Sequence, residues 1–456
     1  MAQQNKSAQE SQQLGFKSKE EASSALENSL NKLVKAGGFS FLENVIDGLP
    51  NMNPERKARK NIFMSDPAKA SEREQLKKRL GIWLELLGES ETVAELVEKS
   101  EEKAEASNKL LNKNLGVALE SFKDLEQSYR SVALFYKNTE SDKLKNVTIL
   151  NASLDQVTDL DNSRFIDYVA EELKQNYDRL DLRDNYSLLV IPGYMGANKV
   201  VEKWAKIAHE NKVMLVTDFA NLDTPDDVID LFTDGNYTGG DVYRSNVIMA
   251  CNWLVGRGKV EQAGETEDLF VPPSAALAGK MYYTMMSQVT AGKKHGSMNE
   301  VDAVHFDLKK SEISNLEKLG LVPMVNEYGK VMAFSAKTLF NGDNLGLQTY
   351  SVVRVFDYIT KVLFDFLNRR AFENWTSKLE ADLRSQIVKF LDGIQGPDRL
   401  IEKFKILKLE QDPQQKDRVL IDIHITPYFP AKSFVVKLDG QKGDDGTEWN
   451  SEYKQS

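Results

Sequence analysis

Gly193 and Gly196 belong to the stretch of this sequence whose residue types and spacing come nearest to a chemical site. They lie in VIPGYMGANKVV, where an apolar run predicts a strand and the residues after Gly196 predict a helix. Backbone N–H groups at the start of a helix can hold a phosphate group. The spacing matches neither the dinucleotide-binding fingerprint nor the phosphate-binding loop of nucleotide hydrolases, and a tight turn needs glycine for backbone reasons alone. An α/β enzyme that binds a phosphorylated ligand at residues 193–198 is therefore an alternative interpretation.

Other residues that commonly carry catalysis or bind metals are few and widely spaced. The four histidines (His209, His295, His305 and His424) include no pair at the spacing of metal ligands. Cys251 is the only cysteine, so one chain forms neither a disulfide nor a thiolate cluster. The sequence has no GxSxG motif, and the acidic stretch DGQKGDDG does not fit a calcium loop and is expected to be a solvated tail. We expect no catalytic residue, no metal and no cofactor, and thus not an enzyme.

Composition restricts the class of protein further. Hydrophobic residues make up 41% of the 456 residues, which is enough for a folded core. The net charge of −10 argues against a general nucleic-acid-binding protein, which needs an excess of Lys and Arg. The polar residues 1–20 resemble neither a signal peptide nor a membrane span. We therefore expect a cytoplasmic protein with no nucleic-acid or membrane partner.

The elements that would position a site alternate between strand and helix in the middle of the chain. YSLLVIPGY and VMLVTDFA are predicted to be buried strands of the parallel type, and helices are expected over 164–180 and 199–210. This alternation predicts an α/β fold with a central βαβ-type sheet flanked by helices. NVTILNAS predicts a further strand before them, and LVPMVNEYGKVMAF predicts a hairpin that turns at 327–329.

The N-terminal region is predicted to consist of a polar arm, a linker and helices. Helices are expected over 71–87 and 92–111, and a separate amphipathic helix from about residue 115. Before them lies an apolar island of Ile62, Phe63 and Met64, which predicts a short strand without a hairpin partner. Because an unpaired strand invites pairing with another chain, we expect these residues to join an intermolecular sheet.

The C-terminal region is predicted to contain two amphipathic helices followed by two interlocking strands. The first helix begins at residue 350 with an apolar stripe, and the second spans 377–394. The first strand has one apolar face, which we also expect in an intermolecular sheet. We divide the chain into an N-terminal arm with helices (1–110), an α/β body (111–345) and a C-terminal domain ending in the acidic tail (346–456). The stripe comprises Val355, Ile359, Val362, Leu363 and Phe366, and the strand face Val419, Ile421, Ile423 and Ile425.

Two stretches resemble contractile-sheath proteins. SFKDLEQSYRSVALFYKNTE resembles the signature of large contractile sheath subunits of type VI secretion systems (TssC/VipB-like), and YSVVRVFDYITKVLFDFLNRRAFE resembles the C-terminal helix of sheath proteins generally, phage tail sheaths included. The usual Leu-Pro-Arg and Leu-Pro-Tyr-Gly steps are replaced here by CNWLVGRG, which indicates a divergent branch. The matching positions are Phe122, Leu125, Glu126, Tyr129, Arg130, Ser131, Thr139 and Glu140 in the first stretch, and Val352, Arg354, Tyr358, Ile359 and Phe372 in the second.

The resemblance implies a structural protein. The large subunit would pair with a small sheath subunit (TssB/VipA-like), and the pairs would stack with other copies into a helical sheath around an inner tube (Hcp-like). The sheath would lie in the bacterial cytoplasm on an envelope-anchored baseplate, contract to propel the tube, and be disassembled by a Clp-type ATPase. Lys378, Arg384 and Lys389 are hypothesised to face the inner tube. The alternative within this class is the sheath of a phage tail or of an extracellular contractile injection system.

Overall fold

The computed structural model describes residues 62–89, 92–139, 144, 147–182, 185–432, 435–442 and 447–454. The chain divides into two compact units, Met1–Val117 and Ala118–Ser456. Helix α6, Val93–Asn138, runs through the boundary between them, so the two helices predicted over 92–111 and from 115 are one helix of 46 residues. Within the described part of the chain, we find no helix with the length and apolar character needed to cross a membrane.

The described part of the first unit is helical. It contains the 3-10 turn η1 (Pro67–Lys69), α5 (Ala70–Glu89) and the beginning of α6. Ile62, Phe63 and Met64 lie in a helical turn over 62–65, so the strand predicted for them is wrong as local structure. The Arg73 guanidinium donates to the Phe63 carbonyl at 2.6 Å. A lone strand would leave its backbone groups without partners, whereas the turn and Arg73 satisfy them within the chain.

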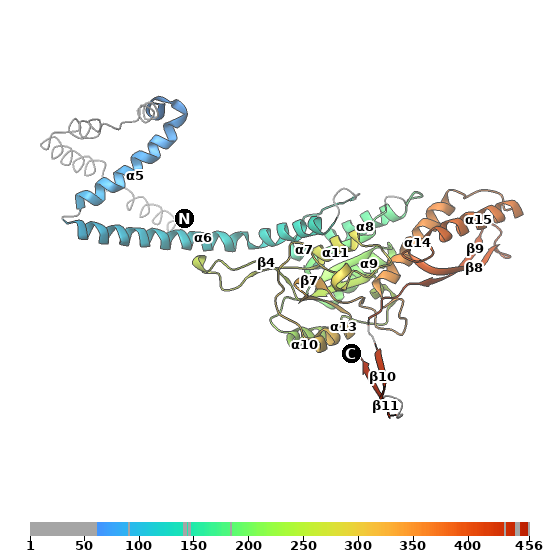
Figure 1. Ribbon diagram of the computed structural model, residues 1–456. Coiled ribbons are helices and arrows are strands. Elements are labelled where there is room, and N and C mark those ends of the chain that lie inside the picture. The colour runs from blue at the N-terminus through green and yellow to red at the C-terminus, as the bar shows by residue number, and fades with distance from the viewer. Residues whose placement is uncertain are drawn as a thin grey trace. The chain divides into compact units, whose positions relative to one another are not determined.

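A five-stranded sheet forms the centre of the second unit (Figure 1). Its strand order is β1-β2-β3-β6-β7. The first four strands are parallel, and β7 is antiparallel to β6. The predicted α/β fold and hairpin are thus confirmed, and the hairpin turns at Tyr328 and Gly329, whose φ angles of 56° and 73° suit a two-residue turn. The strands are β1 (Leu188–Tyr194), β2 (Met214–Asp218), β3 (Val247–Cys251), β6 (Leu321–Glu327) and β7 (Lys330–Ala333).

Helices cover both faces of this sheet. Alternate residues of β2 belong to two different cores: Leu215 packs with helices α8, α9, α10 and α13, and Met214 packs with α6, α11 and α14.

The predicted strand NVTILNAS is wrong, because residues 147–153 lie outside any strand and Ile149 is exposed, with no core beneath it. The helices are α7 (Leu154–Thr158), α8 (Arg164–Tyr177), α9 (Asn198–Glu210), α10 (Pro225–Gly235), α11 (Ser274–Tyr283), α12 (Gly292–His295) and α13 (Lys310–Lys318). Shorter elements are η3 (Val242–Asn246), η4 (Glu261–Ala263) and the strand pair β4 (Leu254–Arg257) and β5 (Leu269–Val271).

The C-terminal elements form a second helix-on-sheet layer. Helices α14 (Tyr350–Asn368) and α15 (Ser377–Ile394) lie beside the antiparallel pair β8 (Ile401–Gln411) and β9 (Val419–Pro427) in Figure 1. The sequence did not predict β8, whose register shifts at two places and thereby interrupts its apolar alternation.

The chain closes with a second antiparallel pair, β10 (Val435–Lys442) and β11 (Thr447–Lys454). Where the stretch DGQKGDDG is described, it is not an irregular tail, because residues 439–442 belong to β10. Residues 443–446 lie outside the described residues, and solvation of the stretch stays a prediction.

Candidate functional site

The part of α6 after residue 117 carries a row of apolar side chains on its outer face. Five of them recur at steps of three and four residues and remain exposed, so the predicted amphipathic pattern is present but nothing in the described chain covers it. We call these residues the α6 stripe. They are Phe122 (60% exposed), Leu125 (66%), Tyr129 (72%), Val132 (39%) and Tyr136 (38%).

The opposite face of the same helix packs against the body. Ser131, Leu134 and Asn138 are buried there, and Asn138 Oδ1 accepts from the Asn299 amide at 2.8 Å. Helix α11 approaches at Gly279, where a Cβ atom would lie 2.4 Å from the Phe135 carbonyl oxygen. The α6 stripe therefore points away from a helix face that is firmly held.

An ion-pair cluster on this inner face joins α6 to β4. Arg257 donates to both carboxylate oxygens of Glu126, at 3.0 and 3.1 Å, and to both of Glu265, at 2.6 and 2.8 Å. Arg130 donates to Glu126 at 2.9 Å and to the Gly256 carbonyl at 2.9 Å. These hydrogen bonds from Arg257 lower the pKa of Glu126 and hold the pKa of Glu265 at about 2, while the two carboxylates raise the pKa of Arg257.

Arg257 is a residue that the sequence analysis missed. It lies in CNWLVGRG, the segment in which the chain departs from the sheath pattern, so the resemblance gave no role for it. Its neighbour Gly256 is required by space, because a Cβ atom there would lie 2.5 Å from Val271 Cγ2 and 3.1 Å from Arg130 Cδ. The only sequence feature that could have drawn attention to Arg257 is its position between two glycines. No spacing in the sequence connects it with Glu126.

Helix α14 has the opposite arrangement, with its apolar stripe turned inward. Val355 and Ile359 are buried, and Leu363 and Phe366 pack against the same core, which includes residues of α15, β8 and β9. Arg354 is also buried, and its Nη2 donates weakly to the Met281 carbonyl at 3.4 Å. Burial lowers the pKa of Arg354 to about 10.

Two further contacts tie α14 to the edge of the body. Lys361 Nζ donates to the Tyr186 carbonyl at 2.7 Å, and the Leu182 amide donates to Asp365 at 2.9 Å. After α14 the chain turns at Phe372, which has a φ of 67° and a fully exposed ring. Tyr358, another motif position, is half-buried against the C-terminal core.

The strand residues predicted to pair between chains lie in β9. Ile421, Ile423 and Ile425 turn toward α14 and α15, whereas Val419 at the end is 37% exposed. Among the described residues β8–β9 and β10–β11 are two-stranded, so each ribbon has outer edges without a strand partner. Pairing of these edges, and of residues 62–64, with another chain stays a prediction.

The three basic residues predicted to face an inner tube lie on α15. Lys378, Arg384 and Lys389 are all exposed, and the Arg384 guanidinium lies 3.7 Å from the Glu380 carboxylate. The buried side of this helix carries Leu379, Leu383, Ile387 and Leu391.

The glycine turn at 193–196 is occupied by the protein's own carboxylate. The Gly193 amide donates to Asp218 at 2.8 Å, and the Ser274 amide donates to the same carboxylate at 2.7 Å. Asp218 is buried, and burial raises its pKa to about 7. A phosphate at this turn would compete with Asp218 for the Gly193 amide and be repelled by its charged form, so the phosphorylated-ligand alternative is not favoured. In the described parts of the chain, no three His, Cys, Asp or Glu side chains gather as a metal site.

Comparison with known proteins gives one family across the chain. Three family models match: the TssC/VipB-like N-terminal region at residues 26–115, the type VI secretion system TssC/VipB central domain at 117–341, and the TssC/VipB-like C-terminal domain at 349–455. None of the curated proteins searched matches the chain.

Several solved structures of sheath proteins are similar to the chain at low identity. The contracted helical sheath of the anti-feeding prophage is 15% identical over 69% of this chain and 81% of that chain, with a TM-score of 0.46. The contracted PVC sheath complex of an extracellular contractile injection system is 13% identical over 60% of this chain and 75% of that chain, with a TM-score of 0.42. A sheath tail protein of Desulfitobacterium hafniense is 13% identical over 64% of this chain and 60% of that chain, with a TM-score of 0.37.

Proposed function

We propose, from the premise that the chain belongs to the TssC/VipB family of the type VI secretion system, that it pairs with a small sheath subunit through the α6 stripe. The family makes the protein a structural subunit of a contractile sheath and not an enzyme. We infer that the pairs polymerise with other copies into a helical tube around an inner tube and dock on a baseplate. The phage-tail and extracellular-injection alternatives, which need one type of sheath chain, are not favoured.

The observation that carries the pairing is the exposed α6 stripe. Five large apolar side chains along one helix face form a contiguous patch of the kind that marks a protein interface, whereas single exposed apolar residues need no explanation. Their spacing of three and four residues suits a helix or a groove of a partner. The partner would remove from water a face that the described part of the chain leaves uncovered.

The inner face of α6 supports the same proposal. The cluster of Glu126, Arg130 and Arg257 fixes the helix to β4, and Gly279 allows α11 to approach it closely. A rigid support keeps the five stripe residues in one geometry, so less conformational entropy is lost on binding. We expect the stripe to bind its partner as a preformed surface.

Co-expression with the small sheath subunit tests the pairing. Tyr129→Asp together with Leu125→Asp places two charges in the centre of the stripe, and we expect the partner to be lost from affinity purification. Tyr168→Asp on α8 is the matched control, because Tyr168 is 52% exposed but outside the stripe, and it should retain the partner. Circular dichroism should show the same helix content for all three proteins. Retention of the partner by the double variant would exclude the stripe as the pairing surface.

Strand exchange between neighbouring copies is the second part of the proposal. The outer edges of β8–β9 and β10–β11 offer unpaired N–H and C=O groups, and strands from terminal arms can pair with them while the bodies rotate. Contraction then needs no hydrolysis during the stroke if the extended lattice is metastable. Deletion of residues 1–66 should leave a soluble pair that forms no long tubes in electron micrographs; normal tubes would refute strand exchange by this arm.

Contact with the inner tube is proposed for α15. Lys378, Arg384 and Lys389 are exposed on it, and reversing all three to Glu should prevent sheath assembly around an inner tube while pairing with the small subunit persists. Unchanged assembly would assign these residues to an ordinary solvated face. Disassembly of the contracted sheath by a Clp-type ATPase belongs to the same proposal and is tested by adding the ATPase to contracted tubes.

A further inference from the structure

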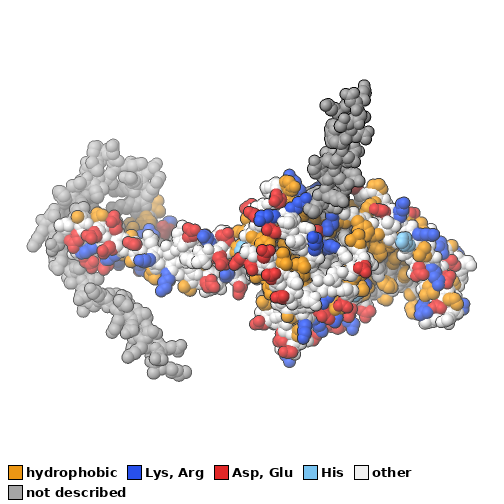
Figure 2. All heavy atoms as spheres, turned by 90° about the horizontal axis from the view of Figure 1, so that it is seen from below, with side chains coloured by type: hydrophobic (Ala, Val, Ile, Leu, Met, Phe, Trp, Pro, Cys, Tyr) orange, Lys and Arg blue, Asp and Glu red, His pale blue; other side chains and the backbone are white. Residues whose placement is uncertain are grey.

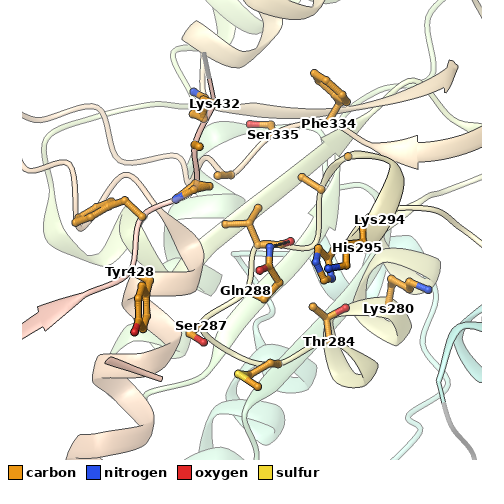
Figure 3. A pocket seen from close by; sticks show the side chains of 18 of the residues that line it. Lys280, Thr284, Ser287, Gln288, Lys294, His295, Phe334, Ser335, Tyr428 and Lys432 are labelled. Carbon is orange, nitrogen blue, oxygen red and sulfur yellow. Dashed lines mark hydrogen bonds between the residues drawn. The ribbon is translucent and has the colours of Figure 1, made fainter. Parts of the chain in front are cut away.

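A groove of about 1240 Å³ opens in the second unit, apart from the α6 stripe. Its wall includes the end of α11 and the loop after it, α12, one side of α13, residues 334–336 after β7, and the segment 428–432 after β9. In Figure 3, Lys280, Lys294 and His295 lie on one side, Tyr428 lies opposite them, and Gln288 is between. Elements far apart in the sequence thus build one continuous surface.

The groove is strongly basic although the whole chain is acidic. Five Lys and Arg side chains and His295 line it, against two carboxylates, Glu317 and Asp398. Glu317 lies 2.7 Å from Lys432 Nζ, and apart from this ion pair the lining has four Lys and Arg side chains against Asp398. On the face drawn in Figure 2, Lys and Arg side chains gather near the middle of the body. The Lys and Arg side chains that line the groove are Lys280, Lys294, Lys310, Arg399 and Lys432.

Burial and nearby lysines disfavour the charged forms of two basic groups that line the groove. The pKa of Lys280 is lowered by burial and then by Lys330, and the pKa of His295 is lowered by burial and then by Lys294 and Lys280. A lowered pKa of a base means that its charged form is destabilised where it stands. An anion in the groove would oppose this effect by favouring the charged forms of Lys280 and His295.

A buried cation adds to the positive potential behind the wall of the groove. Arg354 is 7% exposed, and its Nη2 contacts the carbonyl of Met281, the residue after Lys280. Arg354 Nη1 has no hydrogen-bond partner in the described part of the chain. A buried charge without a counter-ion is costly, and a carboxylate in the neighbouring groove would lower that cost through space.

The lining also contains apolar side chains beside the cations. Met285, Ile313, Phe334 and Phe429 belong to the same wall. A free inorganic anion has no use for such surface, and a nucleic acid would require more continuous phosphate contacts than an acidic protein favours. A polypeptide that alternates carboxylates with apolar side chains matches both parts of the lining.

We propose that this groove binds an acidic, partly apolar segment of the partner chain with which the protein assembles. This inference rests on the proposed function for the existence of a partner, and it assigns that partner a second contact with a defined chemistry. Carboxylates of the segment would lie against Lys294 and Lys310, and its apolar side chains against Phe334 and Ile313.

Fluorescence anisotropy on the purified full chain tests the groove without the natural partner. The probe is a fluorescein-labelled decapeptide of alternating Glu and Leu, with a Gln-for-Glu peptide as its neutral control. Lys294→Glu combined with Lys310→Glu should weaken binding at least tenfold, and binding should fall steeply with salt. The matched control is Lys293→Glu combined with Lys318→Glu, on the same two helices but outside the groove lining, and it should leave the dissociation constant within twofold.

Three results would overturn the inference. They are equal binding of the Glu and Gln peptides, equal weakening by both double variants, and tighter binding of a labelled single-stranded DNA 20-mer than of the acidic peptide. All four substituted lysines are exposed, so the variants should keep their fold, and an unchanged melting temperature checks this. If the α6 stripe is not the pairing surface, the double variant Tyr129→Asp with Leu125→Asp will retain the partner in co-purification, whereas binding of the acidic peptide to the free chain will be unaffected by that result.

Discussion

Helices α6 and α14 both carry motif residues and both have an apolar stripe, yet they turn it in opposite directions. Leu125 in the middle of the α6 stripe is 66% exposed, whereas Ile359 in the middle of the α14 stripe is 2% exposed. Periodicity in a sequence shows that one face of a helix will be removed from water. The apolar stripe of α14 is covered by other elements of the same chain. By our proposal, the α6 stripe is covered by another chain.

The charged side chains of the two helices also have different partners. On α6, Glu126 and Arg130 face the body and are joined with Arg257 in a complementary cluster. On α14, Arg354 and Lys361 are buried, and their hydrogen bonds go to the backbone carbonyls of Met281 and Tyr186. Ion pairs hold α6 against β4, whereas the apolar core holds α14 in place. Lys361 adds a hydrogen bond to the body, but burial destabilises its charged form.

The largest difference should appear when one stripe residue of each helix is truncated. Ile359→Ala removes a fully buried side chain and should lower the free energy of unfolding of the chain by about 2–5 kcal/mol. Leu125→Ala removes an exposed one and should change it by less than about 0.5 kcal/mol. Urea unfolding followed by circular dichroism measures both. Equal losses would mean that the α6 stripe is covered within the chain.

The buried lysine of α14 should give the next largest effect, as a dependence on pH. Burial lowers the pKa of Lys361 from 10.5 to about 8, so between these values the unfolded chain binds more protons than the folded chain. The contribution of Lys361 to the free energy of unfolding therefore rises as the pH increases from about 8 to 10.5. Below about pH 8 the lysine is charged in both states and this gain is absent.

Comparison of wild type with Lys361→Met isolates that contribution. The difference in unfolding free energy should move in favour of wild type by about 2–3 kcal/mol between pH 7 and pH 10. Urea titrations at both pH values measure it, and other titrating groups cancel in the difference. A constant difference would show that Lys361 keeps an ordinary pKa.

The cluster beneath α6 should contribute less than the core of α14. Arg257→Ala leaves Glu265 without its guanidinium partner and should lower the free energy of unfolding by about 1–3 kcal/mol. Lys259→Ala is the control in the same segment and should change it by less than about 0.5 kcal/mol, because its pair with Glu261 is on the surface.

The pH dependence of the same variant sharpens the assignment. In wild type the pKa of Glu265 is lowered from 4.5 to about 2 by Arg257, so its stabilisation is present above pH 4.5 and is lost as pH falls toward 2. The difference in unfolding free energy between wild type and Arg257→Ala should therefore become smaller as the pH falls from 4.5 toward 2. A gap independent of pH would assign the loss to packing of the arginine stem.

The sequence predicted the α/β body and the two C-terminal amphipathic helices because their patterns are local. β1, β2 and the β6–β7 hairpin lie where apolar runs and Tyr328-Gly329 predict them. β8 was missed because register shifts interrupt its alternation. Residues 62–64 form a helical turn because a lone strand there would have no strand partner among the described residues.

The candidate site could be predicted only in part, for a related reason. The motif named Glu126 and Arg130, but Arg257, which donates to Glu126, comes from more than a hundred residues away, and spacing carries no information on such a contact. The direction of the α6 stripe depends on what the rest of the chain leaves uncovered. The basic groove combines α11, α12, α13 and the segment after β9, so it exists only in the folded chain.

The smallest expected effect concerns Phe372, the last residue of the α14 motif, which is exposed like the residues of the α6 stripe. Its ring is fully exposed and its φ of 67° is unfavourable for a side chain with a Cβ atom. Phe372→Gly relieves that strain and should raise the free energy of unfolding by up to about 1 kcal/mol. Phe372→Ala keeps the strain and removes only the exposed ring, so it should change stability by less than about 0.5 kcal/mol.

The same two variants show whether the ring serves assembly. A strained, solvent-exposed aromatic residue that contributes nothing to the fold of one chain is expected to contact another chain. Both variants should then form fewer or shorter tubes in electron micrographs although neither is less stable than wild type. If Phe372→Gly destabilises the chain instead, the ring packs within the fold and is not an assembly contact. Normal tubes from both variants would restrict the outward-facing interface to α6.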